Sequence, residues 1–300
     1  MKIIFFGTPD FAVPSLKILI ENGHDVCAVV TAPDKERGRG RQVSFTPVKE
    51  TALTNNIPVL QPEKLKDEDF VSELKKYNAD LFIIVAFRIL PEEVYTMPKY
   101  GSFNLHGSLL PKYRGAAPIQ WALINGEKET GVTTFFLEKK VDTGNVILKK
   151  VIPIEPEDDL GTLHDKMMQT GAEAVAETVS LIGKGNIVPL QQDDSLASPA
   201  PKITKETCQI DWNNPAEKIH NLIRGLSPYP AAFFERDGKT YKIFKSEITE
   251  NKYGLKPGEV FQDKFNLVIG TTEKAIKILQ IQPEGRKRMT AEEFLRGYKL

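Results

Sequence analysis

Residues 1–20 read MKIIFFGTPDFAVPSLKILI, in which a short apolar run ends at a glycine and is followed by apolar residues at helical spacing. The apolar run at residues 3–6 stops at Gly7, and apolar residues then return at helical spacing until Gly23. A short apolar run between turn signals is typical of a buried strand, and the 3.6-residue spacing is typical of a helix. The stretch therefore predicts strand, turn and helix in that order.

The same alternation continues along the first half of the chain. Residues 26–30 and 81–85 are apolar runs rich in β-branched side chains, and residues 67–76 between them have a helical pattern. Strands that alternate with helices predict an α/β fold with a mostly parallel sheet covered on both faces. In such sheets ligands bind beyond the carboxyl ends of the strands. We therefore expect chemistry in the residues that follow Phe6, Thr31, Val85 and Leu105.

The composition changes at residues 191–205, QQDDSLASPAPKITK, which are polar and lack apolar periodicity. We interpret this segment as a linker between a domain at residues 1–190 and a second domain at residues 206–300. After it, a helical pattern at residues 215–224 is followed by short strand-like runs at 232–234, 241–248, 259–262, 267–269 and 275–281. Short strands separated by turn signals predict a small β-barrel.

The composition indicates a folded protein of a reducing compartment. Of the 300 residues 41% are hydrophobic and 27% are charged, which is ordinary for globular chains. Cys27 and Cys208 are too few for a disulfide framework or a four-cysteine zinc cluster. Residues 1–16 lack the long apolar region of a signal peptide, and no run approaches the ~20 apolar residues of a membrane span. We therefore expect a cytoplasmic protein without membrane contact.

The net charge of zero hides an asymmetry. Residues 205–300 hold 17 Lys and Arg against 13 Asp and Glu, whereas residues 1–204 hold 23 against 27. In addition, Arg37, Arg39 and Arg41 alternate with glycines after the second predicted strand. Arginines in such a loop can pair with phosphates or read base edges, but a solvated loop has the same composition. Charge alone leaves both interpretations open.

Three polar residues form the candidate catalytic site. Asn104 and His106 are two positions apart, so at the end of a strand their side chains leave the same face. An amide donor can hold the oxygen of a carbonyl that becomes tetrahedral, and an imidazole can accept or donate a proton. Asp142, in the turn-like Asp-Thr-Gly at residues 142–144, can orient that imidazole and stabilise its charged form. The pattern predicts a site without a covalent nucleophile.

Structural roles explain the same residues equally well. A histidine among apolar neighbours can simply satisfy a core hydrogen bond, and an Asp before Thr-Gly can cap a turn. A zinc site at His106 is disfavoured because His24, His164 and His220 fall in unrelated segments and form no His-x-x-x-His pair. We therefore expect no metal.

The stretch FNLHGSLLPKYRG at residues 103–115 resembles the signature of the folate-dependent formyltransferases. The similarity continues in AAPIQ at residues 116–120, from ETGVT through VDTG at residues 129–144, and in FGTPDFA at residues 6–12. Near the other end, residues 285–289 and 294–297 match as well. These motifs resemble the members of the family that act on methionyl-tRNA, and they cover nearly the whole chain.

The resemblance implies a Rossmann-like formyltransferase domain followed by an OB-like C-terminal barrel that binds tRNA. It also implies transfer of formyl from 10-formyltetrahydrofolate to the amino group of initiator methionyl-tRNA, which gives N-formylmethionyl-tRNA for translation initiation. Asn104, His106 and Asp142 would occupy the catalytic positions, and Arg37, Arg39 and Arg41 the tRNA-contacting insertion. We expect no obligate protein partner.

The resemblance places folate between two segments of the chain. The family often has Ala-Tyr-Gly before an Ile-Leu-Pro in the loop against the folate ring, whereas residues 85–91 read VAFRILP and appear one residue shorter. Backbone groups of such a loop can still bind a pterin edge. The expected folate contacts are Phe87, Arg88, Ile89, Leu90, Ser108, Leu109, Leu110 and Pro111.

Three other functions compete with this one. A dinucleotide-binding dehydrogenase is excluded because residues 7–12, GTPDFA, lack the Gly-x-Gly-x-x-Gly spacing. A sugar-nucleotide formyltransferase would share the folate donor and the Asn-x-His pair, but the arginine-glycine loop and residues 115–120 favour tRNA. An inactive tRNA-binding module would have no chemical need for Asn104, His106 and Asp142 together.

Overall fold

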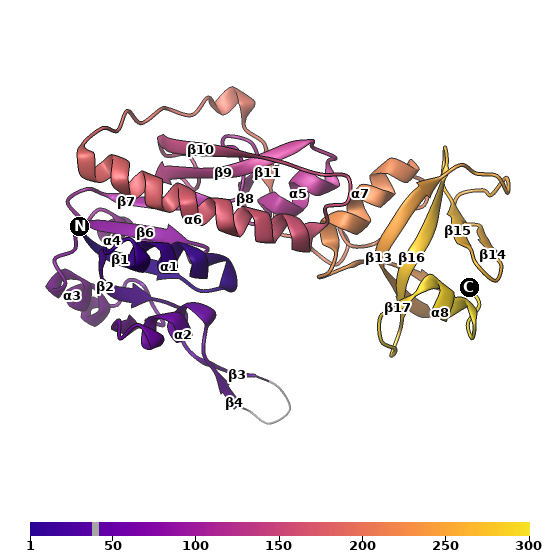
Figure 1. Ribbon diagram of the computed structural model, residues 1–300, viewed down its shortest axis with the longest axis horizontal. Coiled ribbons are helices and arrows are strands. Elements are labelled where there is room, and N and C mark those ends of the chain that lie inside the picture. The colour runs from indigo at the N-terminus through magenta and orange to yellow at the C-terminus, as the bar shows by residue number, and fades with distance from the viewer. Residues whose placement is uncertain (38–41) are drawn as a thin grey trace. The chain divides into compact units, whose positions relative to one another are not determined.

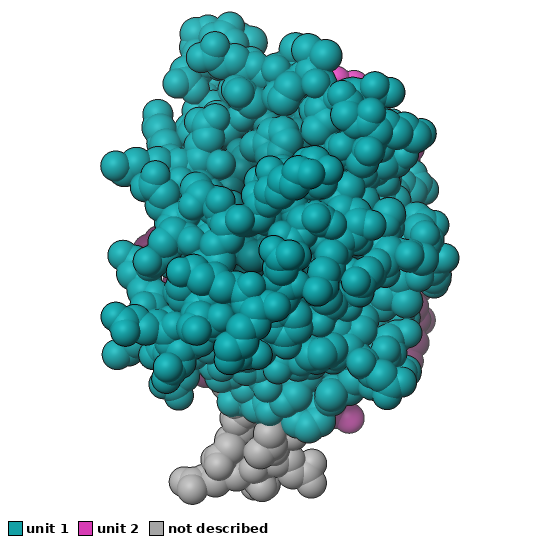
Figure 2. Space-filling view, turned by 90° about the vertical axis from the view of Figure 1, so that its left-hand side faces the viewer, with its two compact units in different colours: residues 1–115, 131–152, 164–199 teal, residues 116–130, 153–163, 200–300 magenta. Residues whose placement is uncertain are grey.

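The computed structural model describes residues 1–37 and 42–300, which divide into two compact units. One unit comprises residues 1–115, 131–152 and 164–199, and its surface is drawn in teal in Figure 2. The other comprises residues 116–130, 153–163 and 200–300. The domain limits expected from the sequence, with a linker at residues 191–205, stay a prediction.

Within the described residues, the first unit is built around a seven-stranded sheet (Figure 1). Its strand order is β10-β9-β7-β6-β1-β2-β5. The strands are β1 (Lys2–Gly7), β2 (Asp25–Val30), β5 (Val59–Leu60), β6 (Leu81–Val85), β7 (Ser102–His106), β9 (Glu129–Phe136) and β10 (Val146–Pro153). Neighbours from β5 to β7 run parallel, whereas β9 is antiparallel to β7. The mostly parallel, Rossmann-like α/β arrangement is confirmed.

Helices cover both faces of this sheet because its strands are apolar on both sides. The helices of this part are α1 (Val13–Glu21), α2 (Pro47–Thr54), α3 (Glu68–Lys76), α4 (Glu92–Tyr95) and α6 (Leu160–Lys184). On one face Phe6 and Ile84 pack with Leu74 of α3 and Val94 of α4. On the other, Gly171 lets α6 approach so closely that a Cβ there would lie 2.8 Å from a Leu105 methyl carbon.

The second unit contains an antiparallel sheet with helices against it. Its six strands, counted in the described chain, are β12 (Ala232–Arg236), β13 (Lys239–Thr249), β14 (Val260–Gln262), β15 (Leu267–Gly270), β16 (Ala275–Pro283) and β17 (Met289–Thr290). The helices are α5 (Pro118–Ile124), α7 (Ala216–Leu226) and α8 (Ala291–Leu295). Ile219 and Ile223 of α7 share one core with Ile243 and Ile278 of the sheet and with Phe294 of α8. Each strand-like run of this region predicted from the sequence overlaps an observed strand.

Short elements complete the chain. They are β3 (Lys35–Arg37), β4 (Gln42–Ser44), β8 (Arg114–Gly115), β11 (Pro199–Ala200), and the 3-10 turns η1 (Asp10–Ala12) and η2 (Asp194–Leu196).

Candidate active site

The register of the first sheet brings Asn104 to a cavity. Asn104 on β7 is paired with Ile84 on the parallel strand β6 and with Phe135 on the antiparallel strand β9. Residues paired across a sheet point to the same face, so the three side chains lie side by side. All three line a cavity of about 110 Å³, together with Tyr95 of α4.

Two loops form the rest of the cavity lining. One is the segment after β6, which contributes Phe87, Arg88, Ile89 and Leu90. The other follows β9 and contributes residues 137–142. The four positions after β6 that were expected to contact folate thus lie around one cavity with Asn104 and Asp142.

The loop after β9 leads from one end of β7 to the other. It begins beside Ser102, because the Leu137 amide donates a 2.8 Å hydrogen bond to the Ser102 carbonyl. It then brings Asp142 to His106, at the other end of β7. Gly144 is required for this path, because a Cβ there would overlap the carbonyl oxygen of Phe136. The backbone at Asp142 is left-handed, with φ of 56°, which aspartate tolerates better than most residues.

His106 is buried, with 6% of its surface exposed, and both ring nitrogens face polar groups. Its Nε2 lies 2.8 Å from the Tyr113 carbonyl oxygen. A carbonyl oxygen only accepts, so Nε2 carries the hydrogen and donates it. Nδ1 is then the basic nitrogen of the neutral ring, and it lies 3.9 Å from Asp142 Oδ2. The arrangement therefore sets the unprotonated nitrogen of the neutral ring beside a carboxylate.

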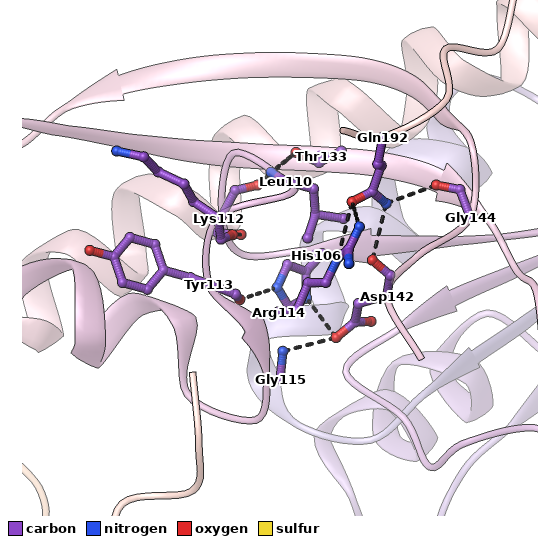
Figure 3. A network of polar contacts seen from close by, with 11 residues as sticks. His106, Leu110, Lys112, Tyr113, Arg114, Gly115, Thr133, Asp142, Gly144 and Gln192 are labelled. Atoms are coloured by element: carbon purple, nitrogen blue, oxygen red, sulfur yellow. Dashed lines mark hydrogen bonds and ion pairs between the residues drawn. The ribbon is translucent and has the colours of Figure 1, made fainter. Parts of the chain in front are cut away.

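Asp142 is held by its neighbours on both its side chain and its backbone. Its Oδ2 accepts a 3.0 Å hydrogen bond from the Gly115 amide. Its carbonyl oxygen accepts a 3.0 Å bond from Gln192 Nε2, and the same nitrogen donates to the Gly144 carbonyl at 2.8 Å (Figure 3). Asn104 and Asp142 line one cavity and His106 lies beside Asp142, so the structure brings the three residues together, while their catalytic roles stay a prediction.

The sequence pattern indicated no role in the site for Gln192 or Arg114. Arg114 donates from Nε at 3.2 Å and from a terminal nitrogen at 2.7 Å to Gln192 Oε1, as Figure 3 shows. Gln192 belongs to the polar segment interpreted as a linker, and nothing in that composition distinguishes it from its neighbours. Arg114 lies within the family signature, but its partner was not identifiable from the pattern.

The expected folate contacts differ in their surroundings. Arg88 donates to the carbonyls of Pro62 at 2.7 Å and Glu63 at 2.9 Å. Leu90 is buried in the apolar core on that face of the sheet, whereas Ile89 is 75% exposed. Ile89 is therefore free to cover a ligand.

The second expected folate segment is not among the cavity-lining residues. Ser108 Oγ donates to the Lys112 carbonyl at 2.6 Å, and its own carbonyl accepts from Thr133 Oγ1 at 2.7 Å. The Leu110 amide donates to the same Thr133 oxygen at 3.1 Å. These bonds shape the turn that delivers the Tyr113 carbonyl to His106, while contact of Ser108, Leu109, Leu110 and Pro111 with folate stays a prediction.

The expected tRNA contacts fall at the edge of the described chain. Arg37 ends β3, which pairs with β4, while Arg39 and Arg41 lie outside the described residues. Across residues 1–37 and 42–300, no three His, Cys, Asp or Glu side chains are grouped as metal ligands would be. No helix in the same ranges is both long and apolar enough to span a bilayer.

Sequence comparisons identify relatives over the full chain. The Formyl transferase family matches residues 1–179, and the Formyl transferase, C-terminal domain family matches residues 202–299. A protein of Caldanaerobacter subterraneus subsp. tengcongensis described as methionyl-tRNA formyltransferase is 52% identical over 302 residues, which cover 100% of this chain and 98% of that protein.

Structural comparisons give the same fold at lower identity. HypX from Aquifex aeolicus in complex with tetrahydrofolic acid is 21% identical with a TM-score of 0.67, covering 100% of this chain and 48% of that one. An N-formyltransferase from Helicobacter canadensis, in complex with folinic acid and dTDP-3-aminofucose, is 23% identical with a TM-score of 0.69, covering 93% and 98%. Given the full-length match at 52% identity, the chain belongs to the methionyl-tRNA formyltransferase family.

Proposed function

We propose that the protein transfers the formyl group of 10-formyltetrahydrofolate to the amino group of methionyl-tRNA, giving N-formylmethionyl-tRNA for translation initiation. The observation that carries this proposal is the 52% identity, over the whole chain, to a relative described as methionyl-tRNA formyltransferase. Asn104 and Asp142 on one cavity, with His106 beside Asp142, supply the chemistry that formyl transfer needs. The reaction belongs in the cytoplasm, where charged initiator tRNA is used.

Asn104 is the oxyanion donor of this proposal. Among the described residues, none forms a hydrogen bond with its side-chain amide, and it lines the cavity. When the amine attacks the formyl carbon, the carbonyl oxygen gains negative charge, which a fixed N–H donor stabilises. The amide of Asn104 would donate to that oxygen.

His106 and Asp142 would together handle the proton that the attacking amine loses: His106 accepts it, and Asp142 pairs with the charged ring. The amine must lose a proton once it has bonded to carbon, and Nδ1 of His106 is the nitrogen free to accept it because Nε2 donates to the Tyr113 carbonyl. The imidazolium formed in this way faces the Asp142 carboxylate at 3.9 Å. When the bond between the formyl carbon and N10 of the donor breaks, the imidazolium would return this proton to N10, so that tetrahydrofolate leaves and the ring becomes neutral again. Asp142 is therefore placed to pair with the ring while it carries the proton of the amine.

The residues around the cavity fit one ring system of the folate donor. Phe87, Tyr95 and Phe135 supply aromatic surface, while the backbone after β6 supplies polar groups that can read a pterin edge. At about 110 Å³ the cavity is smaller than the roughly 300–1,000 Å³ of sites for drug-sized ligands. The remainder of the donor would therefore extend along the surface past Ile89.

The C-terminal unit is proposed to be an OB-like barrel that contacts tRNA. Support comes from its antiparallel six-stranded sheet, counted in the described chain, and from the excess of 17 basic over 13 acidic residues in residues 205–300. We place the boundary between the folate domain and this barrel within residues 191–205.

A formyl-transfer assay tests the proposed function. Purified protein is given 10-formyltetrahydrofolate and either charged initiator tRNA or dTDP-3-aminofucose, an amino sugar bound by the structural neighbour of Helicobacter canadensis. We expect formylation of the tRNA and none of the sugar. Transfer to the sugar alone would establish the sugar-nucleotide alternative, and transfer to neither would support a binding module without catalysis.

Replacing Arg37, Arg39 and Arg41 together with alanine is expected to weaken tRNA binding and leave folate binding intact. Each arginine that neutralises a phosphate releases counterions, so the slope of log affinity against log salt should become less negative by about 0.7 to 0.9 for each lost contact. Binding measured across a salt series on wild type and variant gives both quantities, with folate affinity measured on the same samples.

A charge-matched variant controls for the loss of three positive charges. Lys64, Lys66 and Lys75 are exposed, and their replacement with alanine changes the net charge equally. This control should leave tRNA affinity close to wild type. If the arginine variant behaved like the control, or lost folate binding equally, the arginines would not be a tRNA contact.

A further inference from the structure

We propose that Gln192 is a positioning residue for formyl transfer, which holds the Asp142 loop so that the carboxylate faces His106. The proposal rests on the proposed function of His106 and Asp142. It assigns a role in the site to a glutamine about 50 residues further along the chain, through contacts that Figure 3 shows together.

The hydrogen bonds of Gln192 determine the orientation of its amide. Its nitrogen donates to two carbonyl oxygens, those of Asp142 and Gly144, and its oxygen accepts two N–H groups of Arg114. If the amide were flipped, its oxygen would face two carbonyl oxygens and its NH₂ would face a guanidinium. Every donor and acceptor would then be mismatched. The position therefore requires a group with a donor on one side and an acceptor on the other.

The backbone delivers Gln192 to this place. Leu190 and Val146 exchange two backbone hydrogen bonds, each of 2.8 Å, which join the segment to the start of β10. Gln192 is two residues after Leu190, and Gly144 is two residues before Val146, so an antiparallel pairing places them opposite each other. Arg114 is fixed in turn by Asp194, whose Oδ1 lies 2.7 Å from its guanidinium.

The Asp142 loop needs such an external support. Asp142 is in the left-handed region, with φ of 56°, which is unfavourable for a residue that carries a Cβ. Gly144 packs against the Phe136 carbonyl at the other end of the turn. The Gln192 amide donates to the carbonyls of Asp142 and Gly144, which lie on either side of Thr143. The left-handed conformation of Asp142 brings its side chain to the Gly115 amide. Without Gln192 the turn would lose two of the bonds that fix this geometry.

A double-mutant cycle with Asp142→Asn tests the proposal. Steady-state kinetics with both substrates varied are measured for Gln192→Ala, Asp142→Asn and the double variant, with Gln191→Ala as the exposed control. We expect Gln192→Ala to lower kcat about tenfold with both KM values within about twofold of wild type, because a small displacement of a catalytic group reduces rate more than binding. In the Asp142→Asn background the same change should lower kcat less than about twofold.

Further variants separate positioning from folding. Gln192→Glu keeps the acceptor for Arg114 but sets a carboxylate against two carbonyls, so it should lose as much kcat as alanine. A crystal structure of Gln192→Ala should show the distance between Asp142 Oδ2 and His106 Nδ1 increased beyond 3.9 Å. That structural result requires no activity, so it tests the inference even if wild type fails to formylate tRNA.

Several outcomes would overturn the inference while the proposed function stands. They are wild-type kcat in Gln192→Ala, an equal loss in both backgrounds of the cycle, and an unchanged Asp142 loop in the variant structure. An equal loss in both backgrounds would mean that Gln192 acts independently of the Asp142 carboxylate. Absence of tRNA formylation by wild type would instead count against the proposed function.

Discussion

Replacing His106 with alanine is expected to lower the kcat of formyl transfer by about a hundredfold or more, because the variant lacks the group that we propose takes the amine proton. The ring is buried, and its Nε2 is committed to the Tyr113 carbonyl at 2.8 Å. Nδ1 is therefore the ring nitrogen left to accept the proton of the amine in the proposed reaction, and Asp142 faces that atom. Single-turnover kinetics with the formyl donor and charged tRNA measure the step directly.

His24→Ala is the matched control for this variant. His24 precedes β2, at the amino end of the parallel strands, whereas His106 ends β7 at the carboxyl end where ligands bind. Loss of His24 should leave the rate unchanged. If folded His106→Ala, with a circular dichroism spectrum like that of wild type, formylated tRNA at the wild-type rate, the imidazole would have a purely structural role.

The strands of the fold were predictable because their signals are local. The apolar runs at residues 3–6, 26–30 and 81–85 lie within β1, β2 and β6, and a parallel sheet follows from the helices between them. The long helix α6 (Leu160–Lys184) went unpredicted. Its glycine at position 171 argues against a helix by propensity, yet that residue lets α6 pack against Leu105. Tertiary packing at this position overrides a local preference that the sequence shows plainly.

The candidate site also has a part that local sequence signals predict and a part that depends on contacts between distant residues. The two-residue spacing of Asn104 and His106 predicts a shared face, and the parallel register of β7 and β6 places Asn104 beside Ile84. Gln192 and the Tyr113 carbonyl were not predictable, because one comes from a polar segment far along the chain and the other is a backbone group without side-chain identity. Which nitrogen of His106 is basic follows from that carbonyl, so the sequence left the role of the ring open.

Replacing Asn104 with aspartate is expected to lower kcat by at least about a hundredfold, with the variant folded. The two side chains have nearly the same shape, so packing against Ile84 and Phe135 is retained. The substitution removes the N–H donor and sets a carboxylate where, in the proposed reaction, the oxygen of the formyl group gains negative charge. Repulsion then adds to the lost hydrogen bond, so the loss should exceed that of Asn104→Ala. Steady-state kcat for both variants gives the comparison.

The order of the two variants distinguishes an oxyanion donor from a residue that only shapes the cavity. If Asn104 merely filled space, aspartate would preserve the rate and alanine would lose it. If it donates to a developing oxyanion, aspartate is the more damaging change because charge, unlike volume, is altered. Asn186→Asp, at an exposed position, controls for the added negative charge. An Asn104→Asp variant more active than Asn104→Ala would therefore contradict the oxyanion role, since a carboxylate cannot stabilise negative charge beside it.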